Sequence, residues 1–367
     1  MSDARRYVEL PTPLTLRHGG RLPDARVAYE TWGQLNGDAS NAVLICTGLS
    51  PSAHVCSSAD DSCAGWWEDM VGVGKPIDTQ KWFVVCFNAL GGCFGSTGPA
   101  SPNPATGEPW RLDFPMLTLE DNATVASLLL DALDIDQLAA VIGPSMGGMT
   151  ALAFAMMFPE RTRNFVSISS AARAMPFAIA LRSLQRELVR ADRDWQDGHY
   201  DHDSVPVRGM RLARKLGMIT YRSADEWRQR FGRERIAQSA SSGEMFGPEF
   251  EVESYLQAHA RKFTGAFDPN CYLYLSRAMD MFDAAEHGGS LEAGVGLLQV
   301  DRALVIGVAS DFLFPLWKQQ ELAELMQSAG IDTGMVALDS IQGHDSFLVD
   351  MDRFRPAVAQ FMGRVDA

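Results

Sequence analysis

Ser145 is the residue whose setting in this sequence points most directly to chemistry. It lies at the centre of Gly-Pro-Ser-Met-Gly (143–147), a Gly-x-Ser-x-Gly pentapeptide. A serine hydroxyl is a weak nucleophile at neutral pH, so it needs a base with a pKa of about 7 and a third group that orients this base. An apolar run, 138–142, precedes the motif, and a small and apolar stretch, 148–158, follows it. This order predicts a strand, a sharp turn and a helix that expose Ser145 as a nucleophile.

Two downstream residues have the types and positions that such a serine requires. Asp311 follows the apolar run 303–308, and His344 lies shortly after a second apolar run, 335–338. A histidine can take the proton of the hydroxyl, and an aspartate can orient the histidine and stabilise its charged form. The order Ser, acid, His, with each partner on a loop after a strand, fits the topology of a nucleophile turn. We therefore predict that Asp311 and His344 are the catalytic partners of Ser145.

The tetrahedral intermediate of acyl transfer needs two backbone N–H groups directed at its oxygen. Met146, the residue after the nucleophile, is predicted to supply the first of them. For the second we select Leu49, in the loop Thr-Gly-Leu-Ser-Pro (47–51) that follows the apolar run 42–46. His54 lies close to this loop in the sequence, so it is a further candidate for a place at the mouth of the site.

Short apolar runs alternate with helical patterns, which predicts a doubly wound, mostly parallel sheet. The helical patterns of the core include 119–133, with Thr118 as its N-cap, and 317–328. The short apolar runs are typical of buried parallel strands. They lie at 42–46, 82–87, 138–142, 165–168, 303–308 and 335–338.

The N-terminal part has a different pattern. Two β-rich segments, 14–16 and 25–31, lie on either side of Gly19 and Gly20. Glycine pairs are common in the tight turns between antiparallel strands, because glycine adopts backbone conformations that other residues avoid. We therefore predict that the two segments form a β-hairpin.

The alternation of strands and helices stops after Ala172. From there to about residue 296 the sequence is helix-like and has no convincing buried strand, and the strand pattern then returns. We predict an α/β-hydrolase fold, with a mostly parallel eight-stranded sheet interrupted by a helical lid. Its parts are a first core segment, 1–172, the lid, 173–296, and a second core segment, 297–367. The predicted lid helices lie at 177–190, 207–217, 224–231, 250–263 and 272–282.

The composition excludes some classes of partner. The 367 residues carry a net charge of −14, which repels phosphate backbones and argues against nucleic acid. No run approaches the roughly 18 apolar residues of a membrane span, and the N-terminal segment lacks the apolar centre of a signal peptide. The six cysteines lack zinc-ligand spacing, so we expect reduced thiols, no metal and a cytoplasmic protein. Residues 173–235 are richer in basic than in acidic side chains. These side chains belong either to ordinary solvated helix faces or to an entrance for an anionic cosubstrate.

Five further segments have distinctive sequences. They are Asn-Ala-Leu-Gly-Gly-Cys-Phe-Gly-Ser-Thr-Gly-Pro (88–99), Asn-Pro-Ala-Thr-Gly (103–107), Leu-Ala-Arg-Lys-Leu-Gly-Met-Ile-Thr-Tyr-Arg (212–222), Tyr-Leu-Tyr-Leu-Ser-Arg-Ala-Met (272–279) and Gly-His-Asp-Ser-Phe-Leu (343–348). Together they resemble motifs of the homoserine O-acyltransferases, a branch of the α/β-hydrolase superfamily, and the likeness runs through nearly the whole chain. The resemblance implies an acyl-CoA donor, a ping-pong route through an acyl group on Ser145 and an amino-acid hydroxyl as acceptor. It also implies no bound cofactor and a homodimer built through the lid.

The same resemblance implies roles for three more residues. In the family, the positions that match Arg214, Tyr221 and Asp345 hold the acceptor amino acid, the arginine at its carboxylate and the aspartate at its ammonium group. The residue types support this, because Arg214 and Tyr221 are seven positions apart on one helix face. A guanidinium is also a natural bidentate partner for a carboxylate. The alternative is an ordinary exposed arginine beside a packed tyrosine.

Two segments beside the reacting centre depart from the family pattern. Where the family usually has His-Ala-Leu-Thr-Gly, this chain has Thr-Gly-Leu-Ser-Pro (47–51), and where it usually has Gly-Gly-Ser, this chain has Pro144 before the serine. Both changes resemble a subgroup that acts as L-serine O-succinyltransferase in cysteine biosynthesis. We therefore predict transfer of a succinyl group from succinyl-CoA to L-serine. The alternatives are L-homoserine O-acetyltransferase or O-succinyltransferase in methionine biosynthesis, and a carboxylesterase or thioesterase of the same fold.

Transfer of a succinyl group requires a partner for its distal carboxylate. Arginine is suited to this because its guanidinium binds carboxylates through two parallel hydrogen bonds. The sequence offers several arginines in or near the lid and does not distinguish among them. The candidates are Arg173, Arg182, Arg186 and Arg277.

Overall fold

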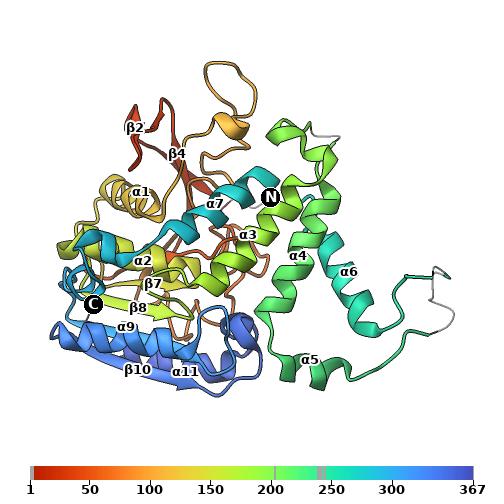
Figure 1. Cartoon of the computed structure of the whole chain (residues 1–367). Coiled ribbons are helices and arrows are strands. Elements are labelled where there is room, and N and C mark those ends of the chain that lie inside the picture. Colours follow the sequence, from red (N-terminus) through yellow and green to blue (C-terminus); the bar gives the residue numbers. More distant parts are fainter. Residues whose placement is uncertain (1–3, 202–203, 238–242, 244, 367) are drawn as a thin grey trace.

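A central eight-stranded sheet organises the protein, as the computed structural model shows for residues 4–201, 204–237, 243 and 245–366 (Figure 1). Its strands span Arg6–Glu9 (β1), Arg26–Trp32 (β4), Ala42–Cys46 (β5), Phe83–Phe87 (β6), Ala140–Pro144 (β7), Asn164–Ile168 (β8), Arg302–Val308 (β9) and Asp332–Leu338 (β10). Their order is β1-β4-β6-β5-β7-β8-β9-β10. Strand β4 is antiparallel to its neighbours β1 and β6, and the pairs from β6 to β10 are parallel. The predicted eight-stranded, mostly parallel sheet is confirmed.

Two apolar layers cover the faces of the sheet. Because successive side chains of a strand point to opposite faces, Leu44 and Val85 belong to one layer, and their neighbours Val43 and Val84 to the other. The helices of the core are α1 (Leu119–Ala132), α2 (Met146–Met157), α8 (Leu291–Val295), α9 (Leu316–Ser328), α10 (Ser346–Val349) and α11 (Met351–Met362). Helices α1, α2, α8 and α9 contribute to the first layer, and α11 contributes to the second. The sheet is therefore a rigid platform for loops at its carboxyl edge.

Helix α1 shows how directly the sequence determines a local boundary. Thr118 has extended backbone angles and accepts the N–H of Asp121 through its hydroxyl at 3.2 Å. The Asp121 carboxylate accepts the N–H of Thr118 in return, at 2.8 Å. This reciprocal capping box satisfies N–H groups that a helix start leaves without partners. The prediction of Thr118 as the N-cap is confirmed.

The predicted pairing of the N-terminal hairpin was wrong. Residues Leu14–Thr15 (β2) pair with Arg21–Leu22 (β3) around the expected glycine turn, in a separate two-stranded sheet. Strand β4 joins the main sheet instead, between β1 and β6. Strand β4 is largely buried, so its backbone N–H and C=O groups need partners, which β1 and β6 provide on its two edges. Strand β1 has a polar sequence and largely exposed side chains. It therefore lacks the apolar pattern by which the other strands were predicted.

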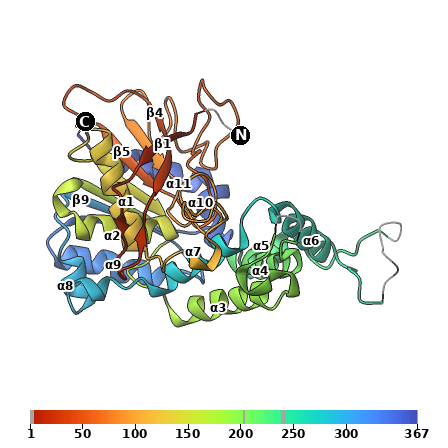
Figure 2. The same ribbon diagram turned by 90° about the horizontal axis from the view of Figure 1, so that it is seen from above.

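Helices α3 to α7 form the described part of the lid, between β8 and β9, and much of it lies to one side of the sheet (Figure 2). They are α3 (Pro176–Arg190), α4 (Val207–Tyr221), α5 (Ala224–Phe231), α6 (Glu251–Phe263) and α7 (Pro269–Met281). The chain leaves and re-enters the core at one place, because the N–H of Ala284 donates to the carbonyl of Ala172 at 2.9 Å. We keep 173–296 as the proposed extent of the lid, and within this range α8 packs with the core helix α9 instead. Across the described residues, every helix is too short or too polar to cross a membrane.

Candidate active site

Ser145 occupies a sharp turn between β7 and α2. Its backbone has φ 55° and ψ −124°, a conformation that residues other than glycine rarely adopt. Two glycines permit the turn: a Cβ at Gly143 would lie 2.0 Å from the carbonyl oxygen of Gly147, and a Cβ at Gly147 would lie 2.1 Å from that of Cys46. Ser145 also donates its N–H to the carbonyl of Ile168 at 2.9 Å. The turn is thus fixed against both neighbouring strands.

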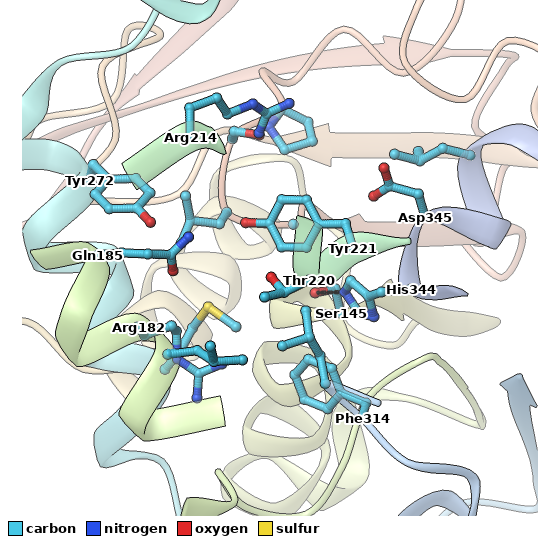
Figure 3. A pocket seen from close by; sticks show the side chains of 18 of the residues that line it. Ser145, Arg182, Gln185, Arg214, Thr220, Tyr221, Tyr272, Phe314, His344 and Asp345 are labelled. Carbon is cyan, nitrogen blue, oxygen red and sulfur yellow. Dashed lines mark hydrogen bonds between the residues drawn. The ribbon is translucent and has the colours of Figure 1, made fainter. Parts of the chain in front are cut away.

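The structure brings Ser145, His344 and Asp311 into one hydrogen-bonded chain. Nε2 of His344 lies 2.8 Å from Oγ of Ser145 (Figure 3), and Nδ1 lies 2.7 Å from Oδ2 of Asp311. The other carboxylate oxygen of Asp311 accepts the N–H groups of Leu313 and Phe314 at 2.9 and 3.0 Å. Because a carboxylate only accepts, Nδ1 donates to Asp311 and Nε2 is left to accept the serine proton. The arrangement can activate Ser145 for nucleophilic attack.

His344 is held by packing as well as by hydrogen bonds. It lies in a short 3-10 turn, Gly343–Asp345, and its side chain stacks on the ring of Phe314 with 5.1 Å between ring centres. Gly343 has φ 68°, and a Cβ there would lie 2.8 Å from the carbonyl oxygen of Tyr221. Any larger residue at Gly343 would therefore push the turn away from the lid and move the imidazole.

The charge of His344 predicts the pH dependence of the site. Burial lowers the pKa of His344, but the charge and the hydrogen bond of Asp311 raise it more, so the pKa lies above its ordinary value of 6.5. A protonated imidazole cannot take the proton of Ser145. We expect kcat/KM for the acyl donor to be lost as the pH falls through a midpoint above 6.5, measured in steady-state assays across the neutral range. A midpoint at or below that value would contradict the assignment.

The two residues selected for the oxyanion hole lie beside the nucleophile. Met146 is the first residue of α2 and is buried. The first N–H groups of a helix have no acceptor within the helix, so that of Met146 is available to a developing negative charge. Leu49 lies in the loop after β5 and lines the same pocket as Ser145. Their joint role stays a prediction.

A pocket of about 1060 Å³, including the part open to solvent, lies between the core and the lid above the serine. Arg214, Tyr221 and Asp345 form part of its wall (Figure 3). Nε of Arg214 is buried and has no hydrogen-bond partner among the described residues, and the guanidinium lies 4.4 Å from the ring centre of Phe263. Asp345 pairs with Arg222 at 3.3 Å, and burial raises the pKa of Asp345. The pocket thus presents a cation and an acid to a ligand that carries both charges.

Arg182 is the one of the four candidate arginines that lines this pocket. Its Nε pairs with Asp280 at 2.5 Å, whereas its Nη2 is buried and has no partner in the described part of the chain. Arg186 is bound to the other oxygen of Asp280 at 2.6 Å. Arg173 and Arg277 have exposed or partly exposed side chains away from the pocket. The geometry therefore singles out Arg182.

Sequence reasoning overlooked two polar residues of the pocket wall, Gln185 and Tyr272 (Figure 3). Gln185 follows Arg182 by three positions on α3, and its Nε2 donates to the carbonyl of Ala213 at 3.0 Å. That spacing places both side chains on one helix face, so it was a usable signal. Tyr272 opens one of the distinctive segments, 272–279, but only the packing of α7 against α3 brings its side chain to the pocket.

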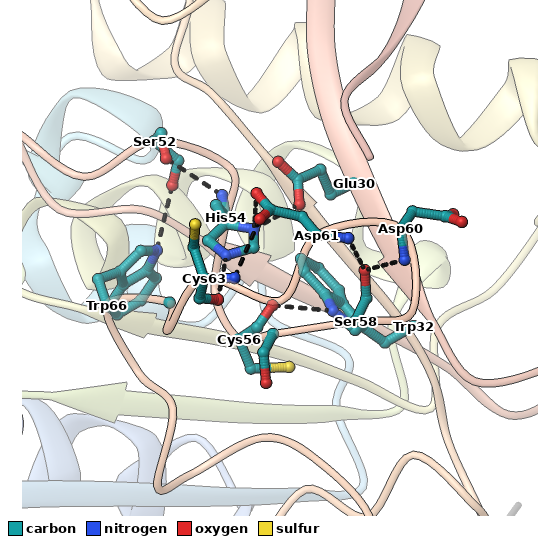
Figure 4. Close-up of polar contacts among 12 residues, drawn as sticks. Glu30, Trp32, Ser52, His54, Cys56, Ser58, Asp60, Asp61, Cys63 and Trp66 are labelled. Atoms are coloured by element: carbon teal, nitrogen blue, oxygen red, sulfur yellow. Dashed lines mark hydrogen bonds and ion pairs between the residues drawn. The ribbon is translucent and has the colours of Figure 1, made fainter. Parts of the chain in front are cut away.

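His54 lies in the loop after β5 and holds this loop by polar contacts (Figure 4). It is not part of the pocket lining. Its Nδ1 lies 2.8 Å from Oε2 of the buried Glu30, and its Nε2 lies 2.9 Å from the carbonyl oxygen of Cys63. Both partners accept hydrogen bonds, so both ring nitrogens must donate, as in the protonated imidazole. Burial lowers the pKa of His54, but Glu30 and the Cys63 carbonyl raise it above its ordinary value. His54 therefore links β4 to the loop and does not line the mouth of the pocket.

Known proteins share this architecture. Residues 41–334 match a family model described as alpha/beta hydrolase fold. A serine O-succinyltransferase of Litchfieldella anticariensis is 57% identical over 99% of this chain and 99% of its own length. Among solved structures, esterase E22 is 28% identical with a TM-score of 0.89, covering 98% of this chain and 99% of its own. A homoserine O-acetyltransferase from Bacillus anthracis is 26% identical with a TM-score of 0.89, over 100% of both chains.

Proposed function

We propose that this chain, which belongs to the α/β-hydrolase family and to its serine O-succinyltransferase branch, moves a succinyl group from succinyl-CoA to the hydroxyl of L-serine. The proposal includes the acyl-CoA as cosubstrate, a cytoplasmic location and a role in cysteine biosynthesis. Its strongest support from the site is that Ser145 lies 2.8 Å from His344 in a pocket whose wall also holds an available guanidinium and a carboxyl group.

In the first half-reaction, Oγ of Ser145 attacks the thioester carbon while Nε2 of His344 takes the hydroxyl proton. The oxyanion that forms accepts hydrogen bonds from the N–H groups of Met146 and Leu49. When the carbon–sulfur bond breaks, the departing sulfur takes the proton from His344, and CoA leaves as the thiol. The succinyl group remains as an ester on Ser145, and Asp311 stabilises the imidazolium while it exists.

In the second half-reaction, L-serine enters with its carboxylate on Arg214 and its ammonium group on Asp345. The hydroxyl of the bound serine gives its proton to His344 and attacks the ester carbon. The ester bond to Ser145 breaks, and His344 returns the proton to Oγ. The product is O-succinylserine and the enzyme is unchanged. Holding the acceptor at both charged groups favours its hydroxyl over water.

The function is tested by assaying the purified protein with each pair of donor and acceptor. We expect succinyl-CoA with L-serine to give the highest kcat/KM among the combinations of succinyl- or acetyl-CoA with serine or homoserine. A preference for acetyl-CoA and homoserine would instead support the activity named for the Bacillus anthracis structure.

Hydrolysis is the second candidate, because esterase E22 shares the whole fold at a TM-score of 0.89. The same serine and histidine would hydrolyse the acyl-enzyme if water reached it. The charged groups at Arg214 and Asp345 argue against this, since an ester hydrolase has no need to hold an amino acid. Release of CoA that is as fast without an acceptor as with L-serine would decide for hydrolysis.

Arg182 is the proposed partner of the distal succinyl carboxylate. We expect Arg182→Leu to lower kcat/KM for succinyl-CoA by about a hundred- to a thousandfold, because a buried carboxylate would lose its cation. Acetyl-CoA carries no distal carboxylate, so we expect kcat/KM for acetyl-CoA to fall much less. Retained activity with acetyl-CoA would also show that the variant folds. Arg277→Leu is the matched control. Equal losses with both donors would refute this role.

A homodimer built through the lid is part of the proposal. Two lid helices carry exposed apolar side chains at seven-residue spacing, which aligns them on one face of each helix. They are Phe177 and Leu184 on α3, and Leu212 and Ile219 on α4. Such apolar stripes favour association, because contact between two chains removes the stripes from water.

We expect a Leu212→Glu, Ile219→Glu double variant to shift the molar mass from two chains to one, as measured by light scattering after gel filtration. Leu297→Glu serves as the control, because Leu297 is exposed and lies in the second core segment, outside the lid. A double variant that keeps the mass of the unaltered protein would contradict a dimer at this face.

A further inference from the structure

We propose that the groove between α5 and the loop after β10 binds the phosphate groups of the CoA donor, with the aromatic side chains of α5 and α6 as a surface for its adenine ring. The inference rests on the proposed function, since it concerns the donor of that reaction. The groove is lined from the lid by Arg222, Glu226 and Arg230, and from the core by Gln342 and Val349.

The groove adjoins the pocket of the nucleophile along two segments of the chain. Tyr221 and Leu348 line the pocket, and the next residues along the chain, Arg222 and Val349, line the groove. The thioester of an acyl-CoA is separated from its phosphates by the long pantetheine arm. When the thioester carbon is at the serine, the phosphates must therefore lie outside the pocket. A groove that begins where the pocket wall ends is a suitable place for them.

Cationic side chains of the lid act on His259, and two of them, Arg222 and Arg230, line the groove. Arg230 lies above the ring of Tyr255 at 4.3 Å, and this ring contacts the imidazole of His259 at 4.1 Å between centres. Partial burial lowers the pKa of His259, and Lys262, Arg230, Arg214 and Arg222 lower it further. Helices α4, α5 and α6 lie together in the lid (Figures 1 and 2). The four cationic groups therefore act on one region.

The acidic groups in this region neutralise only part of that charge. Glu226 pairs with Arg222 at 3.6 Å and with Arg230 at 3.4 Å, and Asp345 pairs with Arg222 at 3.3 Å. Against these two carboxyl groups stand the guanidinium groups of Arg214, Arg222 and Arg230 and the ammonium of Lys262. The groups that act on His259 and their ion-pair partners thus carry a positive balance in a chain whose net charge is −14. Such a local reversal attracts a polyanion to this face and away from the remaining surface.

The aromatic side chains provide the second element of a nucleotide site. Trp227 and Phe231 of α5 and Tyr255 of α6 form a cluster, with 5.1 Å between the ring centres of Phe231 and Tyr255 and 6.0 Å between those of Trp227 and Tyr255. Purine rings stack on aromatic faces and on guanidinium planes. Arg230 lies at the junction of the cationic and the aromatic groups, so it can contact a phosphate and the base together.

The test compares two donors that differ only in the nucleotide part. Succinyl-CoA carries the phosphates and adenosine, whereas succinyl-pantetheine has the same thioester arm without them. We expect an Arg230→Gln, Lys262→Gln double variant to lose about ten- to a hundredfold in kcat/KM with succinyl-CoA, chiefly through KM. Its kcat/KM with succinyl-pantetheine is expected to match that of the unaltered protein. Added salt should weaken use of succinyl-CoA more steeply in the unaltered protein than in the variant.

Arg228→Gln is the matched control, because Arg228 also lies on α5 but has a largely exposed side chain paired with Asp225. It should behave as the unaltered protein with both donors. Equal losses of the double variant with both donors, or no loss with either, would overturn the phosphate site. An unaltered protein that consumes neither donor would instead refute the proposed function, so the two failures can be told apart.

Discussion

Replacement of Ser145 with alanine is expected to abolish succinyl transfer, lowering kcat by about a millionfold. The reason is that Oγ of Ser145 is the atom that forms the covalent ester, and no other hydroxyl contacts His344 among the described residues. Removal of this hydroxyl costs one hydrogen bond, so the free energy of unfolding should change by about 1 kcal/mol or less. Steady-state assays and thermal unfolding of the same preparation measure the two effects.

Ser167→Ala is the control for this experiment. Ser167 is buried in β8, and its hydroxyl has no hydrogen-bond partner in the described part of the chain. We therefore expect full transfer activity from it. If Ser145→Ala retained transfer above the background rate, the covalent route would be wrong.

Loss of Arg214 should have the second largest effect, because it removes the proposed partner of the acceptor carboxylate. We expect Arg214→Gln to lower kcat/KM for L-serine by about a hundred- to a thousandfold, since truncating one partner of a buried charge pair costs about 2 to 5 kcal/mol. The measurement varies L-serine at saturating succinyl-CoA. The rate of CoA release in the absence of acceptor is measured for the same variant. We expect this rate to fall at least about tenfold less than kcat/KM for L-serine does.

Arg208→Gln provides the comparison, because Arg208 lies on the same helix and has an exposed side chain. This variant should keep the serine kinetics of the unaltered protein. An equal loss in both half-reactions of Arg214→Gln would show that Arg214 supports the site as a whole rather than the acceptor.

The strands of the core and the three residues Ser145, Asp311 and His344 could be predicted from the sequence, because they depend on local signals. Buried parallel strands appear as short apolar runs, and the loops that follow them meet at one edge of the sheet. That rule alone selected Asp311 and His344, and the structure brings His344 within hydrogen-bond distance of both Asp311 and Ser145. The glycines at 143 and 147 also have a local cause, the close approach of neighbouring backbone.

The remaining features depend on contacts that no local pattern encodes. Arg182 and Arg186 lie four positions apart on one face of α3, and the difference between them arises from Asp280 on a helix far along the chain. Asp280 binds both arginines but leaves Nη2 of Arg182 without a partner among the described residues. The polar edge strand β1 and the tie between His54 and Glu30 are of the same kind. Each is decided by the packing of distant segments.

The proposed function depends most on a succinyl ester at Ser145 that L-serine removes and water does not. Its most direct test mixes the protein with succinyl-CoA without acceptor, digests it and measures the mass of the peptide that contains Ser145. We expect this peptide to gain the mass of one succinyl group, and addition of L-serine to remove the group with formation of O-succinylserine. An unmodified Ser145, or a succinyl ester lost to water as fast as to L-serine, would contradict the proposal.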